Sequence, residues 1–388
     1  MQAAVSSLRD AARAIAPLAR TYADQAERDR QLAGPVVAAL RDAGLFRMLV
    51  PRELGGAEAT VADLVDCIEA VAEGDGAAGW CLMIAATTGL TAALLPKQGA
   101  MEIYNDPASI TGGMLMPRGT AERVPGGYRV SGCWAYGSGS PHCTWLLGGV
   151  TVIDAEGKPE MLPSGHPHLR MAFFLAGSYS ILDTWHVAGL RGTGSHDYEV
   201  RDLFVPEHHT VAIGGETPWA DGPLYRFPLY GLLAIGVAAV GLGIARAAID
   251  ELSSLARAKT PTGSRRVLAE RAAAQSGLAE AEALLGASRA FLFDAVALAW
   301  AAAMVGDAMP IAERARLRLA ATHAARSCAR AVDICYDLGG GSAIYESSPL
   351  QRHFRDMHTL TQHVMVGQQM YEVVGRIMLG LPTDTFML

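Results

Sequence analysis

The chain has 388 residues, of which 51% are hydrophobic and 18% are charged, and its formal net charge is −7. This composition supports a large buried core divided into two or three subdomains, and it excludes a disordered chain. The acidic balance, without a long run of either sign, argues against nucleic acid or a membrane surface as the main partner.

The first part of the chain, to about residue 108, is predicted to be helical. Apolar positions recur at helical spacing from Leu32 to Leu45, and Gly44 is a stop signal. A turn-rich segment follows at Pro51–Gly56, and further helices are expected over residues 61–71 and 80–95. The first 30 residues are charged throughout and lack the apolar centre of a signal peptide, so we expect a cytoplasmic protein.

The character of the sequence changes near Ile110. Val124–Val130 (VPGGYRV) predicts a hairpin, because turn residues are flanked by residues that favour strands. Short strands are also expected over 145–153, 171–175 and 198–205, which together suggest a small barrel or sandwich.

Helical character returns after Pro228 and persists to about Leu379. Phe227–Ala245 is uncharged and barely long enough to span a membrane, but its glycines and the alanine-rich continuation favour a buried helix. Helices, then strands, then helices predict a mainly α protein with a central β domain, and they disfavour an alternating βαβ nucleotide fold. The predicted domains are 1–108, 109–212 and 213–388.

No metal site is expected from the obvious candidates. The six cysteines form no CxxC pair and are predicted to be free thiols. His353, His358 and His363 recur every five residues, so successive members of a helix would point about 140° apart and would not share a face.

Four motifs carry a family resemblance along nearly the whole chain. They are Leu45–Gly56 (LFRMLVPRELGG), Ser131–Gly139 (SGCWAYGSG), Trp185–Ser195 (WHVAGLRGTGS) and Leu338–Ser342 (LGGGS). Together they resemble the acyl-CoA dehydrogenase superfamily. The resemblance implies an N-terminal helical domain, a middle β-barrel and a C-terminal four-helix bundle. It also implies a homotetramer, built as a dimer of dimers.

Within that superfamily the sequence resembles the two-component flavin-dependent monooxygenases. In the dehydrogenases a Tyr-Glu-Gly follows an Arg-Asp pair, and its Glu removes the substrate proton. Here the segment eight residues after Arg355 reads His363-Val364-Met365, and valine cannot accept a proton. The Tyr136-Gly137-Ser138 turn also resembles the oxygen-using branch.

This resemblance implies the oxygenase component of a two-component system. A separate reductase would supply reduced FAD or FMN, and O2 would be the co-substrate. A C4a-hydroperoxyflavin would then hydroxylate a small aromatic or heteroaromatic substrate of indole or phenol type.

The resemblance gives His363 and Ser138 catalytic roles. A neutral imidazole at His363 could remove a phenolic or indolic proton. Ser138 would hydrogen-bond near flavin N5 and slow the loss of peroxide, with Tyr136 and Gly137 along the same flavin edge. A capped or core histidine and an ordinary turn serine are the structural alternatives.

Other segments are predicted to contact the flavin through their backbone. Leu115, Met116 and Pro117 match the segment that packs against the pyrimidine ring. Gly339 and Gly340 lie in a turn that would approach the phosphates of a flavin bound in a neighbouring subunit. A basic loop is expected to accompany them, containing Arg257, Lys259, Arg265 and Arg266.

Trp80 and Thr88 are predicted to lie at the substrate pocket, although a core tryptophan fits Trp80 equally well. Many aromatic hydroxylases of this branch carry a second histidine at the position of Thr88. A threonine cannot act as a base near neutral pH, which leaves room for indoles, thioethers or amines.

Three alternatives stay open at the level of sequence. They are an acyl-CoA dehydrogenase with Glu346 as a relocated base, an N- or S-oxygenase of the same fold, and a flavin-binding scaffold without activity. Arg355 and Asp356 are expected to form an ion-paired scaffold. Arg191 is either a substrate or flavin contact or a surface charge.

Overall fold

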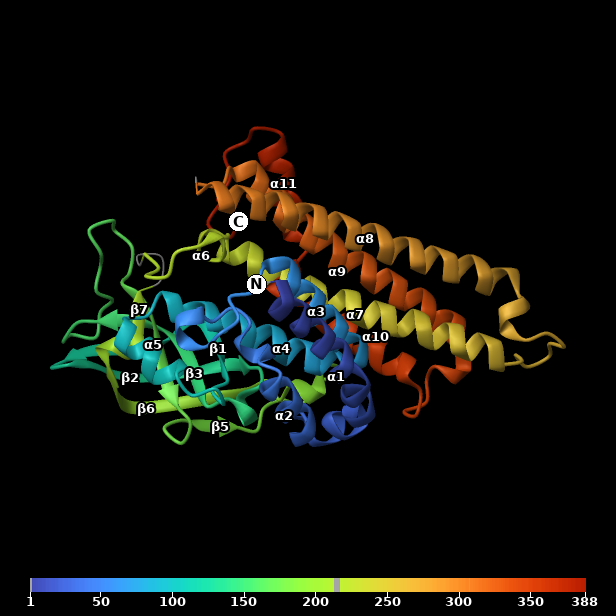
Figure 1. Cartoon of the computed structure of the whole chain (residues 1–388), viewed down its shortest axis with the longest axis horizontal. Coiled ribbons are helices and arrows are strands. Elements are labelled where there is room, and N and C mark those ends of the chain that lie inside the picture. The colour runs from blue at the N-terminus through green and yellow to red at the C-terminus, as the bar shows by residue number, and fades with distance from the viewer. Residues whose placement is uncertain (1, 213–216, 307) are drawn as a thin grey trace.

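The computed structural model describes residues 2–212, 217–306 and 308–388 (Figure 1). The predicted boundary between the second and third domains adjoins residues 213–216, which lie outside the described residues. Helices come first, strands follow, and long helices complete the chain, in the order that the sequence predicts.

Five helices form the N-terminal part of the chain. They are α1 (Gln2–Asp29), α2 (Gly34–Asp42), α3 (Val61–Gly74), α4 (Gly76–Thr88) and α5 (Lys97–Tyr104). The helix predicted over 80–95 begins earlier, because the Asp75 side chain accepts a hydrogen bond from Ala78 N at 3.1 Å and caps α4. Beyond Thr88 the segment continues as a 3-10 turn over Gly89–Ala93.

Seven strands form one sheet. They are β1 (Thr111–Val124), β2 (Gly127–Gly137), β3 (Trp145–Ile153), β4 (Leu169–Leu175), β5 (Ser180–Leu182), β6 (His196–Pro206) and β7 (Thr210–Ala212). The predicted hairpin is confirmed, since β1 and β2 pair antiparallel across Pro125 and Gly126. The sequence did not predict β5 and β7, which have only three residues each and show no alternation.

The strand order is β5-β6-β2-β1-β3-β4-β7, so β5 and β7 are the two ends of the sheet. Within the described residues hydrogen bonds therefore do not close the sheet into the expected barrel. Helix α5 packs beside the end of the sheet where β7 lies, and α4 packs against β1 (Figure 1).

Two bulges interrupt the sheet near the segments predicted to contact flavin. Strand β1 advances from Met114 to Pro117 while its partner β3 advances by one residue, so Leu115 and Met116 leave the ladder. Strand β2 advances from Trp134 to Gly137 while β6 advances by two residues. Bulges of this kind often re-aim side chains next to active sites.

The C-terminal part contains α6 (Pro223–Arg226), α7 (Leu229–Ala258), α8 (Ala272–Val305), α9 (Ile311–Gly339), α10 (Pro349–Leu360) and α11 (Gln369–Met378). Helices α7, α8, α9 and α10 form the four-helix bundle, and α7, α8 and α9 run side by side (Figure 1). Helix α3 packs on α7 and so joins the N-terminal helices to the bundle.

By length and composition alone, three helical segments among the described residues could cross a membrane. In an apolar 18-residue window of each of two segments, Gly76–Ala93 and Leu229–Ala258, 89% of the residues are buried within the protein. Their hydropathy is therefore explained by core packing, as predicted for Phe227–Ala245. In the corresponding window of α8 only 33% are buried, so this helix keeps a large apolar surface.

Candidate active site

Trp80 connects the two residues that the sequence proposed for catalysis. Its indole Nε1 donates a hydrogen bond to Ser138 Oγ at 3.0 Å. The indole ring also meets the His363 imidazole edge-on, with ring centroids 5.4 Å apart. Helix α4, the turn after β2 and the segment after α10 thus converge at one place.

Ser138 begins a chain of buried hydroxyl groups. Ser138 Oγ lies 2.7 Å from Ser195 Oγ, which lies 2.7 Å from Thr193 Oγ1. Thr193 Oγ1 lies 2.7 Å from the carbonyl oxygen of Leu190. All three hydroxyl-bearing residues are at most 5% exposed.

The two ends of this chain fix the direction of every hydrogen bond in it. A carbonyl oxygen only accepts, so Thr193 donates to Leu190 and must accept from Ser195. Ser195 in turn accepts from Ser138. Since the indole N–H of Trp80 only donates, Ser138 Oγ accepts from Trp80 and gives its own proton to Ser195. One lone pair of Ser138 Oγ is left as an acceptor.

The loop that supplies Thr193 and Ser195 is held by α10. Leu190 has a left-handed φ of 51°, and its N–H donates to Asp356 Oδ1 at 2.5 Å. A side chain at Gly189 would collide with the Arg355 carbonyl oxygen, 2.1 Å from the Cβ position, so only glycine permits this approach. Arg355 also pairs with Glu27 at 2.5 Å. Arg355 thus has the ion-paired scaffold role that the sequence suggested, whereas Asp356 contributes to the scaffold through its hydrogen bond to Leu190.

His363 is neutral near pH 7 in this environment. Burial, with a smaller contribution from the charge of Arg318, lowers the pKa of His363 to about 4. His363 Nδ1 accepts a hydrogen bond from Met365 N at 3.3 Å, which begins a 3-10 turn over Val364–Val366. The imidazole proton is therefore on Nε2, and the free edge of His363 is a donor.

Large side chains are exposed around this cluster. Tyr136 is 62% exposed, Met116 is 58% exposed and Val364 is 53% exposed. Tyr136 also has a left-handed φ of 64° at the β2 bulge, a costly conformation for an aromatic residue. Strained backbone and exposed apolar side chains beside an unused acceptor fit a flat ring system with an N–H group, as reduced flavin has.

Comparison with known proteins shows the relationship directly. Residues 2–103 match the acyl-CoA dehydrogenase N-terminal domain, and residues 235–368 match the acyl-CoA dehydrogenase C-terminal domain. The chain is 36% identical to an indole-3-acetate monooxygenase from Pseudomonas putida, covering 91% of this chain and 89% of the other. The chain belongs to the flavin-dependent monooxygenases of the acyl-CoA dehydrogenase superfamily.

Other relatives agree with this placement. The oxygenase component of an FADH2-dependent resorcinol hydroxylase from Rhizobium sp. is 30% identical, covering 95% of this chain and 92% of its own. The structure of XiaF from Streptomyces sp., in complex with FADH2 and glycerol, superposes with a TM-score of 0.90 at 26% identity, covering 97% of this chain and 96% of that one. The 3-HSA hydroxylase of Rhodococcus sp. RHA1 has a TM-score of 0.87 at 27% identity, with coverages of 98% and 99%.

In this monooxygenase the glycine turn is not part of the cluster around Ser138. Gly339 ends α9, and Gly340 follows with a φ of 52°. Lys259 Nζ, at the end of α7, donates to the Gly339 carbonyl oxygen at 2.6 Å, so the predicted basic loop does meet this turn. Among the described residues no hydrogen bond joins the turn to Ser138.

The remaining candidates of the monooxygenase lie in three different settings. Thr88 Oγ1 donates to the Ile84 carbonyl oxygen at 2.7 Å, so its proton is used within α4. Arg191 lines a small cavity with Asp75, Arg352 and Asp356, and it belongs to this charged cluster. Glu346 is exposed in the segment between α9 and α10.

The three histidines that recur every five residues have separate surroundings in the monooxygenase, and His363 lies beyond the end of α10 at Leu360 and not within the predicted helix. His353 is buried, and burial lowers its pKa to about 3. His358 Nε2 lies 2.7 Å from Asp333 on α9, whereas His363 lies against Trp80. They are not brought together as ligands of one ion.

Sequence reasoning missed the roles of Thr193 and Ser195. The sequence identified Trp185–Ser195 only as one of the four segments that carry the family resemblance. Small hydroxyl residues between glycines are common in loops, so their spacing gave no signal of a buried hydroxyl chain.

Proposed function

We propose that this protein is the oxygenase component of a two-component flavin-dependent monooxygenase that hydroxylates a small aromatic or heteroaromatic substrate. Bound reduced flavin, FAD or FMN, supplies the electrons that activate O2. The observation that carries the proposal is the convergence of Ser138, Trp80 and His363, with the Ser138 acceptor directed by the hydroxyl chain.

Some residues of this chain would bind the reduced flavin, and others would bind the aromatic substrate. Ser138 Oγ would accept the N–H of reduced flavin at N5, which keeps that proton in place. Tyr136 and Met116 would cover the ring system and exclude water. Trp80 would wall the substrate pocket, and His363 Nε2–H would donate to the substrate.

These roles favour an indole-type substrate over one that must first be deprotonated. His363 presents a donor rather than a free base, and the Thr88 hydroxyl is used within α4. An electron-rich indole ring reacts without losing its N–H proton. The indole-3-acetate monooxygenase among the relatives supports the same choice.

The dehydrogenase alternative has no support at the site. Val364 occupies the position where the dehydrogenases carry their base. Glu346 is exposed and makes no described contact with Trp80, Ser138 or His363. A carboxylate that removes a substrate proton must reach that proton within hydrogen-bond distance.

The assembly we propose is a cytoplasmic homotetramer that receives reduced flavin from a separate reductase. The support is the apolar surface of α8, where Leu298, Met304 and Val305 are 49%, 61% and 75% exposed. A surface of this kind on a soluble protein usually covers a second subunit. Light scattering on wild type and Leu298→Glu tests this, and a monomeric wild type contradicts it.

The activity is tested by mixing the anaerobic protein and reduced FAD with oxygenated buffer in a stopped-flow instrument. We expect oxidised flavin to appear only after a lag, and indole to be hydroxylated during the same turnover. Oxidation without a lag, at the rate of free reduced flavin, would overturn the proposal. A lag without product from any aromatic compound would overturn the substrate class alone.

A further inference from the structure

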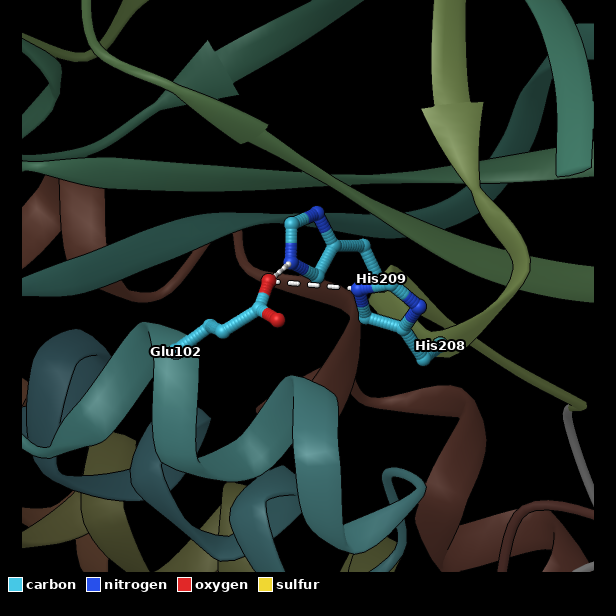
Figure 2. A group of neighbouring side chains, drawn as sticks. All are labelled: Glu102, His208 and His209. Carbon is cyan, nitrogen blue, oxygen red and sulfur yellow. Dashed lines mark hydrogen bonds and ion pairs between the residues drawn. The ribbon is translucent and has the colours of Figure 1, made fainter. Parts of the chain in front are cut away.

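A carboxylate and two imidazoles meet on the side of the protein where α5 packs beside the sheet (Figure 2). Glu102 comes from α5, and His208 and His209 come from a 3-10 turn over Glu207–His209 that precedes β7. Glu102 Oε2 lies 2.6 Å from His209 Nε2 and 3.2 Å from His208 Nε2. All three potential ligand atoms lie within 4.8 Å of one another.

The two elements are held at a fixed separation. A Cβ at Gly99 would lie 1.7 Å from the His208 carbonyl oxygen, so only glycine lets α5 approach this turn so closely. Gly99 and Glu102 are three residues apart and therefore lie on the same face of α5. The separation of the two backbones that carry the carboxylate and the histidines is thus fixed by close packing.

The side chains are also oriented by their neighbours. Gln98 Nε2 donates to Glu102 Oε1 at 3.0 Å, which leaves Oε2 for the histidines. The Trp145 ring meets His209 edge-on, with centroids 5.1 Å apart. Partners that orient ligand side chains in this way are typical of metal sites.

The cluster is open to solvent. The side chains of Glu102, His208 and His209 are 44%, 28% and 12% exposed, so an ion can enter from solvent.

We propose that Glu102, His208 and His209 bind one divalent first-row transition-metal cation, for which Zn²⁺ is the probe. Two imidazole nitrogens and one carboxylate oxygen are a common ligand set for such ions. With bonds of about 2.0–2.1 Å, tetrahedral ligands lie roughly 3.3 Å apart. Small side-chain rotations bring the three atoms to that spacing, and water completes the coordination.

The ion would connect the helical N-terminal part of the chain to the end of the sheet. Glu102 and the two histidines are separated by 106 and 107 positions in the sequence. Because the unfolded chain does not hold them together, bound Zn²⁺ would stabilise the folded state. The site is separate from the flavin cluster and does not depend on the proposed activity.

The experiment is a calorimetric titration of Zn²⁺ into metal-free, tag-free protein. We expect one saturable site per chain, a higher melting temperature with Zn²⁺, and a visible d–d band when Co²⁺ replaces Zn²⁺. His208→Ala, His209→Ala and Glu102→Gln should each weaken binding at least tenfold. His166→Ala, which removes an exposed histidine elsewhere, is the matched control and should bind as wild type does.

Two results would overturn the proposal. One is wild-type protein without saturable binding up to millimolar Zn²⁺. The other is binding that survives in His209→Ala and Glu102→Gln as in wild type. Melting temperatures measured without metal show whether each variant is folded, and Glu102→Gln, which keeps the shape of the side chain, tests the site if a histidine variant is unstable.

Discussion

The backbone N–H of Leu190 donates a hydrogen bond to Asp356 Oδ1 at 2.5 Å. This bond ties α10 to the loop that carries Thr193 and Ser195, and through them it reaches Ser138. An aspartate on the scaffold helix therefore fixes the position of a serine that lies in a different domain of the predicted fold.

Replacing Asp356 should separate its hydrogen-bonding role from its charge. Asp356→Ala leaves the buried Leu190 N–H without an acceptor, which we expect to cost about 1–3 kcal/mol of unfolding free energy. Asp356→Asn keeps an acceptor oxygen and should lose much less. Urea unfolding at pH 6 measures both, and equal losses in the two variants would contradict the role of this hydrogen bond.

Asp356 should also make the stability of the folded protein depend on pH. Burial and the nearby Asp75 raise the pKa of Asp356 to about 7, above its ordinary value near 3.9. The stability that the protonated carboxyl contributes is full below pH 3.9 and is lost as the pH rises through about 7. Asp356→Asn should therefore gain stability relative to wild type between pH 5 and pH 8. A constant difference across that range would show that Asp356 is already ionised at pH 5.

Ser138→Ala should shorten the lag before oxidised flavin appears by at least tenfold, because the acceptor for the flavin N–H is removed. Ser140→Ala is the matched control. Ser140 is a buried serine in the same turn, and its hydroxyl donates to the Gly194 carbonyl oxygen at 3.3 Å. The same shortening in both variants would mean that the loop, and not the Ser138 oxygen, controls the lag.

His363 should remain uncharged well below the ordinary histidine range. Its pKa is lowered to about 4 by burial, whereas the unfolded chain titrates near 6.5. The stability associated with the neutral ring is present above pH 6.5 and is lost as the pH falls through about 4. NMR spectra of wild type and His363→Gln identify the resonance, and a midpoint at pH 6 or above would refute the prediction.

Tyr136 should show a conflict between stability and function. A left-handed φ costs a residue such as Tyr136 about 1–2 kcal/mol, and Tyr136→Gly removes this cost. Glycine loses more conformational entropy on folding, which offsets part of the gain. The flavin-free variant should therefore unfold at a similar or higher temperature than wild type. Reduced-flavin binding should weaken at least tenfold, because the covering ring is lost. Tyr136→Phe keeps the ring and should bind normally, and tight binding by Tyr136→Gly would exclude this role.

The sequence predicted what depends on local patterns and family motifs. The order of helices and strands and the hairpin at Pro125-Gly126 follow from spacing within short segments. The family resemblance implied that Ser138, His363 and Trp80 belong to one site, and their contacts through Trp80 come from the structure. The sequence pattern identifies strands, but it does not show whether hydrogen bonds close them into a barrel. In the described residues β5 and β7 remain the two ends of an open sheet.

The rest could not be predicted because it depends on the approach of distant backbones. The hydroxyl chain requires the left-handed Leu190, and that conformation is stabilised from α10. Adjacent histidines at 208 and 209 gave no metal signal, since their third partner, Glu102, is brought near only by the packing at Gly99.

The hydroxyl chain from Ser138 cannot carry a proton away from the site. It ends on the Leu190 carbonyl oxygen, which accepts a second hydrogen bond from Trp185 Nε1 at 3.1 Å. A carbonyl oxygen cannot pass a proton onward, so this row of hydroxyls acts as a fixed dipole and not as a conducting wire. Any proton released during turnover must therefore leave by a route other than this hydroxyl chain.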